Sequence, residues 1–195
     1  MLTTQQINDR YRRIIASCKE VFEKKGNEYG PTWAVYRWGS LVDQLWIKIK
    51  RIRQLENHEN RVDEPSLVEY VALVNYAVIF LMRLEGDFAL RSSDSIVEDV
   101  SLLESINAER VSALYDRVSE KSFELYLAKN HDYNNAWQDM SISSITDMII
   151  VKILRMRHIV SSPPRLEGKD IAEQLYDVIN YSVFSLILQG EGLNE

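Results

Sequence analysis

Apolar residues recur at helical spacing along most of the chain. Between residues 4 and 25 they keep the three- and four-residue intervals of an amphipathic helix: Ile7, Tyr11, Ile14, Ile15, Cys18, Val21 and Phe22. Residues 40–56 repeat the pattern through Leu41, Leu45, Ile49 and Ile52. No turn pair such as Asn-Gly separates alternating apolar and polar runs, as in a β-hairpin. The pattern therefore predicts an all-α fold.

The chain contains an internal repeat with an offset of 104 residues. Residues 25–53 align without a gap to residues 129–157. The identical pairs are Lys25/Lys129, Tyr29/Tyr133, Trp33/Trp137, Ser40/Ser144, Asp43/Asp147, Lys48/Lys152, Ile49/Ile153, Arg51/Arg155 and Arg53/Arg157. An offset of 105 also places Asn75-Tyr76 on Asn180-Tyr181. Because self-similarity at a fixed period indicates tandem structural units, we expect two copies of one helical unit.

Each copy is predicted to contain three helices, with an aromatic loop after the first. In the first copy the helices span 4–25, 40–57 and 65–85, and the loop spans 26–39. In the second copy the helices span 107–129, 144–160 and 169–189, and the loop spans 130–143. We expect a first repeat at 1–90, a linker at 91–106 and a second repeat at 107–195, with a short extra helix at 96–103.

Two aligned pairs of residues predict the backbone at the start of the loops. Gly26 aligns with Asn130 and Gly30 with Asn134, and Gly and Asn are the residues that most readily adopt a left-handed backbone. We therefore expect Gly26 and Asn130 near the end of the first helix of each copy. Three helices enclose a core poorly, so the two copies are predicted to pack as a pseudo-two-fold helical bundle.

The third helix of the second copy carries polar residues along one stripe. Asp170, Glu173, Asp177 and Asn180 follow one another at spacings of three and four, within about 80° on a helical wheel. Two carboxylates one turn apart beside an amide are the hard oxygen ligands that Mg²⁺ prefers. Alternatively, Glu173 and Asp177 are solvated acids favoured by the helix dipole. Asn180 and its counterpart Asn75 are then buried structural amides.

The second helix of each copy carries a recurring polar set: Asp43, Lys48 and Arg51 in the first copy, and Asp147, Lys152 and Arg155 in the second. The bases are suited to holding phosphates while the aspartate holds a metal ion. The alternative is a set of surface ion pairs, which contribute little. Arg53 and Arg157 fit a solvated face better.

The loops supply flat rings beside lysines. Tyr29 and Trp33 follow Lys25, and the same residues recur in the second copy as Tyr133 and Trp137 after Lys129. Such rings can stack on a nucleobase. Alternatively, the rings close the loop onto the bundle, and we favour this core role for the two tryptophans.

Composition excludes several classes of protein. Asp and Glu number 29 against 23 Lys and Arg, for a net charge of -6, so a broad surface for a nucleic-acid backbone is not expected. A single cysteine excludes an internal disulfide framework. The apolar run at 67–82 is interrupted by Glu69 and Asn75 and is short for a membrane span. We therefore expect a soluble, cytoplasmic protein that does not bind membranes.

Taken together, these residues resemble the nucleotide modification associated domain, type one. The shared pattern is Lys-x-x-Asp-Tyr, a Trp, Asp-x-x-x-x-Lys-x-x-Arg, and an acid-x-x-x-Asp-x-x-Asn-Tyr run. In the second copy it comprises Lys129, Asp132, Tyr133, Trp137, Asp147, Lys152, Arg155, Glu173, Asp177, Asn180 and Tyr181. Tandem copies in one bacterial chain are also typical of that family.

More distantly, the helices are similar to the MazG-type all-α nucleoside triphosphate pyrophosphohydrolases. In that superfamily, acids from two helices hold Mg²⁺ around a nucleoside triphosphate, which implies hydrolysis between the α and β phosphates. This sequence departs from the pattern, because Lys48 and Arg51, or Lys152 and Arg155, stand where the superfamily has a Glu-Glu-x-x-Glu run.

From these patterns we expect a nucleotide-binding or nucleotide-processing protein whose second copy holds the competent site. Asp177 and Glu173 are the expected catalytic pair, with Mg²⁺ on Asp147, Glu173 and Asp177. The expected substrate-binding residues are Lys129, Tyr133, Trp137, Lys152, Arg155 and Asn180, with Lys25, Tyr29, Trp33, Lys48, Arg51 and Asn75 in the first copy. The alternative is a non-catalytic helical ligand-binding or assembly module. A homodimer of the pseudo-dimer is a further expectation.

Overall fold

A computed structural model describes residues 1–58, 65–85, 103, 106–161 and 168–190 of the 195-residue chain. The first repeat contains α1 (Thr4–Tyr29), η1 (Thr32–Val35), α2 (Trp38–Glu56) and α3 (Ser66–Glu85). The second contains α5 (Ala108–Tyr133), η2 (Ala136–Asp139), α6 (Ile142–Ser161) and α7 (Gly168–Leu188). These described segments include no strand, which confirms the all-α prediction. The extra helix expected at 96–103 lies almost entirely outside the described residues.

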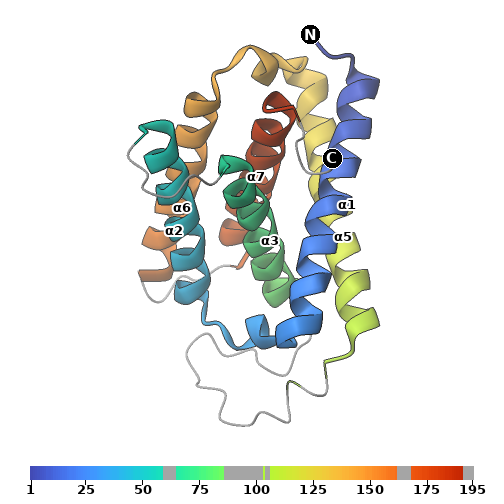
Figure 1. The fold of residues 1–195 in the computed structure, drawn as a ribbon, viewed down its shortest axis with the longest axis vertical. Coiled ribbons are helices and arrows are strands. Elements are labelled where there is room, and N and C mark those ends of the chain that lie inside the picture. The colour runs from blue at the N-terminus through green and yellow to red at the C-terminus, as the bar shows by residue number, and fades with distance from the viewer. Residues whose placement is uncertain (59–64, 86–102, 104–105, 162–167, 191–195) are drawn as a thin grey trace.

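The long helices lie in three layers, each made of one helix from each repeat (Figure 1). The central layer is α3 with α7, flanked by α2 with α6 on one side and by α1 with α5 on the other. Each pair consists of sequence-equivalent helices, as a two-repeat bundle with a pseudo-two-fold axis requires. The bundle is therefore built between the repeats, and neither repeat forms a separate unit.

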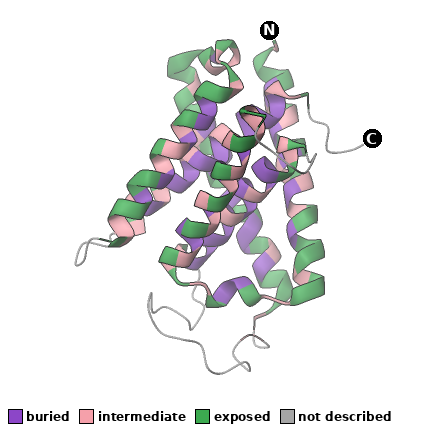
Figure 2. Ribbon diagram, turned by 60° about the vertical axis from the view of Figure 1, so that its left-hand side comes forward, coloured by how far each residue is buried: buried purple, intermediate pink, exposed green. Residues whose placement is uncertain are grey.

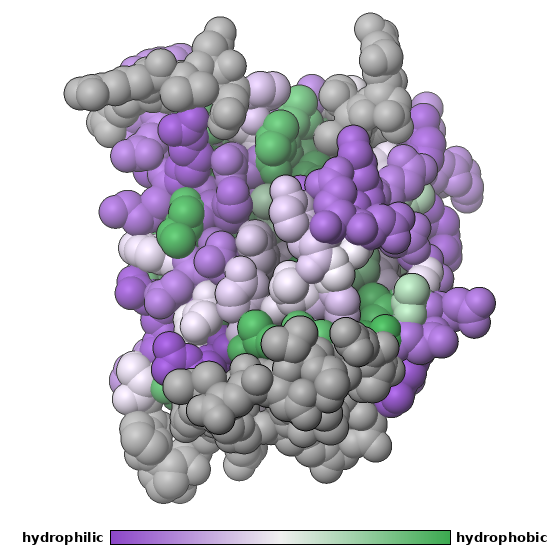
Figure 3. Space-filling model, turned by 60° about the horizontal axis from the view of Figure 1, so that its bottom comes forward, coloured by the Kyte–Doolittle hydropathy of each residue, from purple (hydrophilic) through white to green (hydrophobic). Residues whose placement is uncertain are grey.

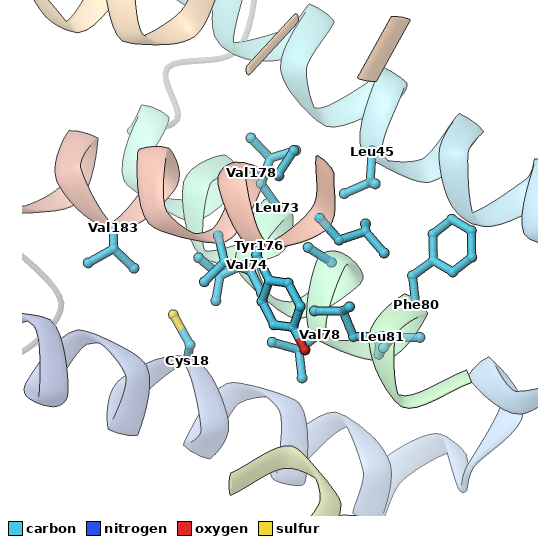
Figure 4. Close-up of a cluster of buried hydrophobic side chains, with 14 of the residues drawn as sticks. Cys18, Leu45, Leu73, Val74, Val78, Phe80, Leu81, Tyr176, Val178 and Val183 are labelled. Carbon is cyan, nitrogen blue, oxygen red and sulfur yellow. The ribbon is translucent and has the colours of Figure 1, made fainter. Parts of the chain in front are cut away.

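Both repeats contribute to one hydrophobic core. In Figure 4, Leu73 and Val74 of α3 lie near Val178 of α7, and Cys18 of α1 points toward the same cluster. The buried positions in Figure 2 run through the middle of the bundle, while the exposed ones lie on its outside. On the face drawn in Figure 3, hydrophilic side chains predominate and the hydrophobic ones are scattered.

α3 is the most apolar helix of the first repeat. By length and hydropathy it is the one helix in the described part of the chain that could cross a membrane. In the bundle, however, 67% of that stretch is buried against other helices. A core helix of this kind meets the same criteria, so its composition is weak evidence for a membrane span.

The first helix of each repeat is longer than the sequence pattern predicts. α1 continues through Gly26 to Tyr29, and α5 continues through Asn130 to Tyr133. The left-handed backbone falls at the second aligned pair, where φ is 66° at Gly30 and 46° at Asn134. Gly26 and Asn130 lie in the last turn of α1 and α5, near the helix end as expected, but they do not themselves adopt the left-handed backbone. Their carbonyls instead accept the capping N–H groups of Gly30 and Asn134, at 2.8 and 2.9 Å.

The two loops do not share one conformation. At Asn134 ψ is 46°, which is the ordinary left-handed region, whereas at Gly30 ψ is -172°. Pro31 follows Gly30, and a proline pushes the preceding residue toward an extended ψ. The two loops therefore share the sign of φ at the aligned position but not the conformation of the whole turn.

The domain boundaries and the pairing of two chains remain predictions.

Candidate functional site

Three helices of the second repeat bring two lysines onto one carboxylate. Lys129 Nζ of α5 lies 2.5 Å from Asp177 Oδ1, and Lys152 Nζ of α6 lies 2.8 Å from Asp177 Oδ2. The Asp177 side chain on α7 is 13% exposed, that of Lys152 26% and that of Lys129 57%. Lys152 is thus the residue of the recurring α6 set that lies beside Asp177. The cluster has two cations for one anion.

Local structure explains why Lys129 reaches this place. It lies one turn before the C-terminal end of α5, so its long side chain can extend toward the middle of α7. Tyr133 stands at the same helix end and is 71% exposed. Burial, together with the nearby charges of Asp177 and Tyr133, raises the pKa of Tyr181 to about 12. A lysine pair, a half-buried carboxylate and two phenols thus meet in one region.

The loop tryptophans pack onto the bundle. Trp137 stacks on Phe184 with ring centroids 4.2 Å apart and nearly parallel planes. Trp33 is buried and packs against Phe22 at 6.3 Å. These contacts favour the core role over the base-stacking role. The exposed rings are those of Tyr29 and Tyr133, the last residues of α1 and α5.

In the first repeat, the lysine equivalent to Lys152 forms an ion pair with a different acid. Lys48 Nζ of α2, equivalent to Lys152, lies 3.1 Å from Glu69 Oε2 of α3, as an ion pair without hydrogen-bond alignment. Glu69 aligns with Gln174, and the position that aligns with Asp177 is Ala72. The acid has therefore moved by one helical turn between repeats. The sequence analysis noted Glu69 only as an interruption of the apolar run at 67–82 and missed this role.

Asn75 and Asn180 are structural amides. Asn180 Oδ1 accepts hydrogen bonds from Tyr11 Oη of the first repeat at 2.7 Å and from Ser122 Oγ at 3.2 Å. Asn75 Oδ1 accepts one from Tyr115 Oη of the second repeat at 2.8 Å. Burial raises the pKa of both tyrosines, so their hydroxyls stay protonated donors.

The amide nitrogens complete this network within each repeat. Asn75 Nδ2 donates to the Cys18 carbonyl at 2.9 Å, and Asn180 Nδ2 donates to the Ser122 carbonyl at 3.4 Å. Both side chains are therefore used inside the bundle. These contacts favour the structural alternative for Asn75 and Asn180, and their expected contact with substrate stays a prediction. Tyr11 and Tyr115 are themselves an identical pair at the 104-residue offset, a signal that the sequence comparison missed.

The recurring aspartates of α2 and α6 pair across the repeats. Asp147 pairs with Arg53, and Asp43 Oδ1 lies 3.7 Å from Arg157 Nη2. The two pairs are equivalent under the pseudo-two-fold, and they place α2 and α6 antiparallel. Arg53 and Arg157, which we expected on a solvated face, are the cations of these two ion pairs.

The structure does not bring Asp147, Glu173 and Asp177 together as a metal set. Asp147 is engaged by Arg53, Glu173 is exposed, and both oxygens of Asp177 face lysines. Among the described residues, no group of three or more His, Cys, Asp and Glu side chains could hold a metal ion. The three-acid site is thus corrected, while Mg²⁺ binding together with a nucleotide stays a prediction.

The other expected ligand-binding residues lie at or near the surface. Arg155 is exposed, one turn after Lys152 on α6, and Lys25 and Tyr29 are exposed at the end of α1. Arg51 is half-buried on α2. Two cavities of about 300 and 370 Å³ involve α1 and α5, and neither is lined by Asp177 or its lysines. The lysine cluster therefore lies outside both cavities.

Comparison with known proteins identifies the repeated unit. A family model described as nucleotide modification associated domain 1 matches the chain twice, over residues 25–84 and 129–188, which together make up more than half of it. Each match begins at the lysine near the end of the first helix and ends near the end of the third. No curated protein and no solved structure matches the chain.

Proposed function

Because the chain belongs to the nucleotide modification associated domain 1 family, we propose that it binds a nucleotide at the second repeat. In this proposal Lys129 and Lys152 contact the phosphates. The observation that carries it is the convergence of these lysines, from two helices, on the single carboxylate of Asp177. Two ammonium groups against one carboxylate leave one positive charge that a phosphate can neutralise.

The internal carboxylate prepares the site for such a ligand. Asp177 holds two flexible lysine side chains together before any ligand arrives, which reduces the entropy lost on binding. Arg155 lies on the next turn of α6 and can supply a further cation. The exposed ring of Tyr133, which lies near Tyr181, offers a face on which a base can stack.

Hydrolysis of the bound triphosphate is the second part of the proposal. It is supported by Glu173 and Asp177, which lie one turn apart on α7. A phosphate that draws Lys129 away leaves Asp177 Oδ1 free to accept a proton from an attacking water, while Lys152 stays on Oδ2. With both Asp177 oxygens held by lysines, the described residues do not fit a bound Mg²⁺ before the nucleotide arrives.

Isothermal titration calorimetry with a panel of ribo- and deoxyribonucleoside triphosphates tests the binding. Lys129→Met and Lys152→Met should each raise the Kd at least tenfold, because each removes one charge and keeps most of the side chain's length. Lys50→Met is the matched control, since Lys50 is an exposed lysine of α2 outside the cluster. Its Kd should stay within twofold of the unaltered protein.

Absence of heat with every nucleotide, in the presence and absence of Mg²⁺, would contradict the proposal and favour the non-catalytic assembly module. An equal loss of affinity in Lys50→Met would show that the lysines act only through overall charge. Release of pyrophosphate, measured separately, distinguishes hydrolysis from binding alone.

A further inference from the structure

We infer that the chain binds one nucleotide rather than two, because the first repeat closes its equivalent site with its own Glu69. This inference rests on the proposed function. Each repeat keeps the lysine of its second helix, Lys48 or Lys152, and each pairs it with an acid of its third helix. The pairs differ in the position of that acid and in the number of lysines that reach it.

The place of the acid differs by one helical turn. In the first repeat the acid is Glu69, and the position one turn later is Ala72. In the second repeat the equivalents are Gln174 and Asp177. The acid therefore stands at the earlier of the two positions in the first repeat and at the later one in the second. As a result, Asp177 is reached by two lysines, whereas Ala72 offers Lys25 no carboxylate.

Burial makes the first pair hard to open. The side chain of Glu69 is 9% exposed, and within the described chain Lys48 is the cation that pairs with it. A ligand that took Lys48 would leave a buried carboxylate without a counter-charge, which is strongly unfavourable. Glu69 thus acts as a permanent internal anion in the position that a phosphate would need.

The second pair can open at a lower cost. If a phosphate takes Lys129, which is the more exposed of the two lysines, Lys152 remains on Asp177 and keeps that carboxylate neutralised. The position equivalent to Glu69 is Gln174, which is buried and uncharged. It therefore forms no ion pair with Lys152. Among the described residues, a polyanionic ligand such as a nucleoside triphosphate therefore meets two converging lysines in the second repeat, whereas in the first repeat Lys48 is held by Glu69.

Exchange of these two positions between the repeats tests the inference. Glu69→Gln with Ala72→Asp gives the first repeat the residues of the second. Gln174→Glu with Asp177→Ala does the reverse. Calorimetry with each nucleoside triphosphate that binds in the panel above should give a stoichiometry of one for the unaltered chain, two for the first double variant and zero for the second.

A third double variant keeps the test informative if an exchanged chain folds poorly. Lys48→Met with Glu69→Gln removes both members of the first pair and leaves no unpaired charge. Its Kd should stay within twofold of the unaltered chain, with one ligand bound. Circular dichroism and thermal melting establish that each variant is folded.

The outcomes separate this inference from the proposed function. Two ligands per unaltered chain, or a tenfold loss of affinity in Lys48→Met/Glu69→Gln, would overturn the inference and leave nucleotide binding intact. No binding by the unaltered chain would overturn the proposed function, and this inference with it.

Discussion

At the residue scale, Asn75 and Asn180 show how a polar side chain is held inside an apolar helix. Each amide oxygen accepts from a tyrosine of the other repeat, and each amide nitrogen donates to a carbonyl of its own repeat. The sequence pattern located both residues and predicted their burial. It could not choose between ligand and structural amide, because the deciding partners, Tyr11 and Tyr115, lie on a distant helix.

Removal of either tyrosine hydroxyl should destabilise the fold. Tyr11→Phe and Tyr115→Phe each take a donor from a buried amide oxygen, at a cost of about 1–2 kcal/mol in the free energy of unfolding. Urea denaturation measures this loss, with Tyr29→Phe as a control because Tyr29 is exposed. Losses below about 0.3 kcal/mol for both variants would show that the network contributes nothing.

At the element scale, the predicted helices agree with the observed ones to within a few residues at most ends. The periodicity of buried side chains marks a helix well, because one face must meet the core. The ends of α1 and α5 were less predictable, since Gly26 and Asn130 are tolerated inside a helix. What stops each helix is the residue of positive φ one turn later, Gly30 or Asn134.

The two helix ends should respond differently to exchange of their residues. Gly30 combines a φ of 66° with a ψ of -172°, a region that essentially only glycine adopts without strain. Gly30→Asn should therefore lower the free energy of unfolding by about 1–2 kcal/mol. Asn134→Gly should change it by only a few tenths, because glycine adopts the left-handed region freely. Urea denaturation measures both, and equal effects would contradict the assigned turns.

At the scale of the whole molecule, the repeat predicted the pseudo-two-fold symmetry but not the ion pairs between the two copies. The identities at Asp43/Asp147 and Arg53/Arg157 suggested a recurring functional set. In the structure these residues pair with each other across the pseudo-two-fold. An identity between repeats can therefore preserve the contact between them. The spacing of residues within one helix could not predict these ion pairs, because the partner of each aspartate lies on the other repeat.

The bundle should lose stability in alkali. Burial raises the pKa of Cys18, Tyr126 and Tyr176 to about 12 from usual values of 9.0 and 10.0. In the unfolded chain these groups ionise near the usual values, so their contribution is complete below about pH 9 and is lost as pH rises toward 12. Urea denaturation at pH 7, 10 and 11 should show falling stability. A constant free energy of unfolding over this range would contradict the burial of these groups.

Phosphate binding by the lysines that meet at Asp177 can be observed one side chain at a time. Lysine resonances observed directly by NMR, after reductive methylation with ¹³C-formaldehyde and assignment through single Lys→Arg variants, report on each side chain separately. Addition of a nucleoside triphosphate should shift the resonances of Lys129 and Lys152 and leave that of Lys48 unchanged. Shifts confined to other lysines, with Lys129 and Lys152 unmoved at saturation, would show that phosphates do not bind at Asp177.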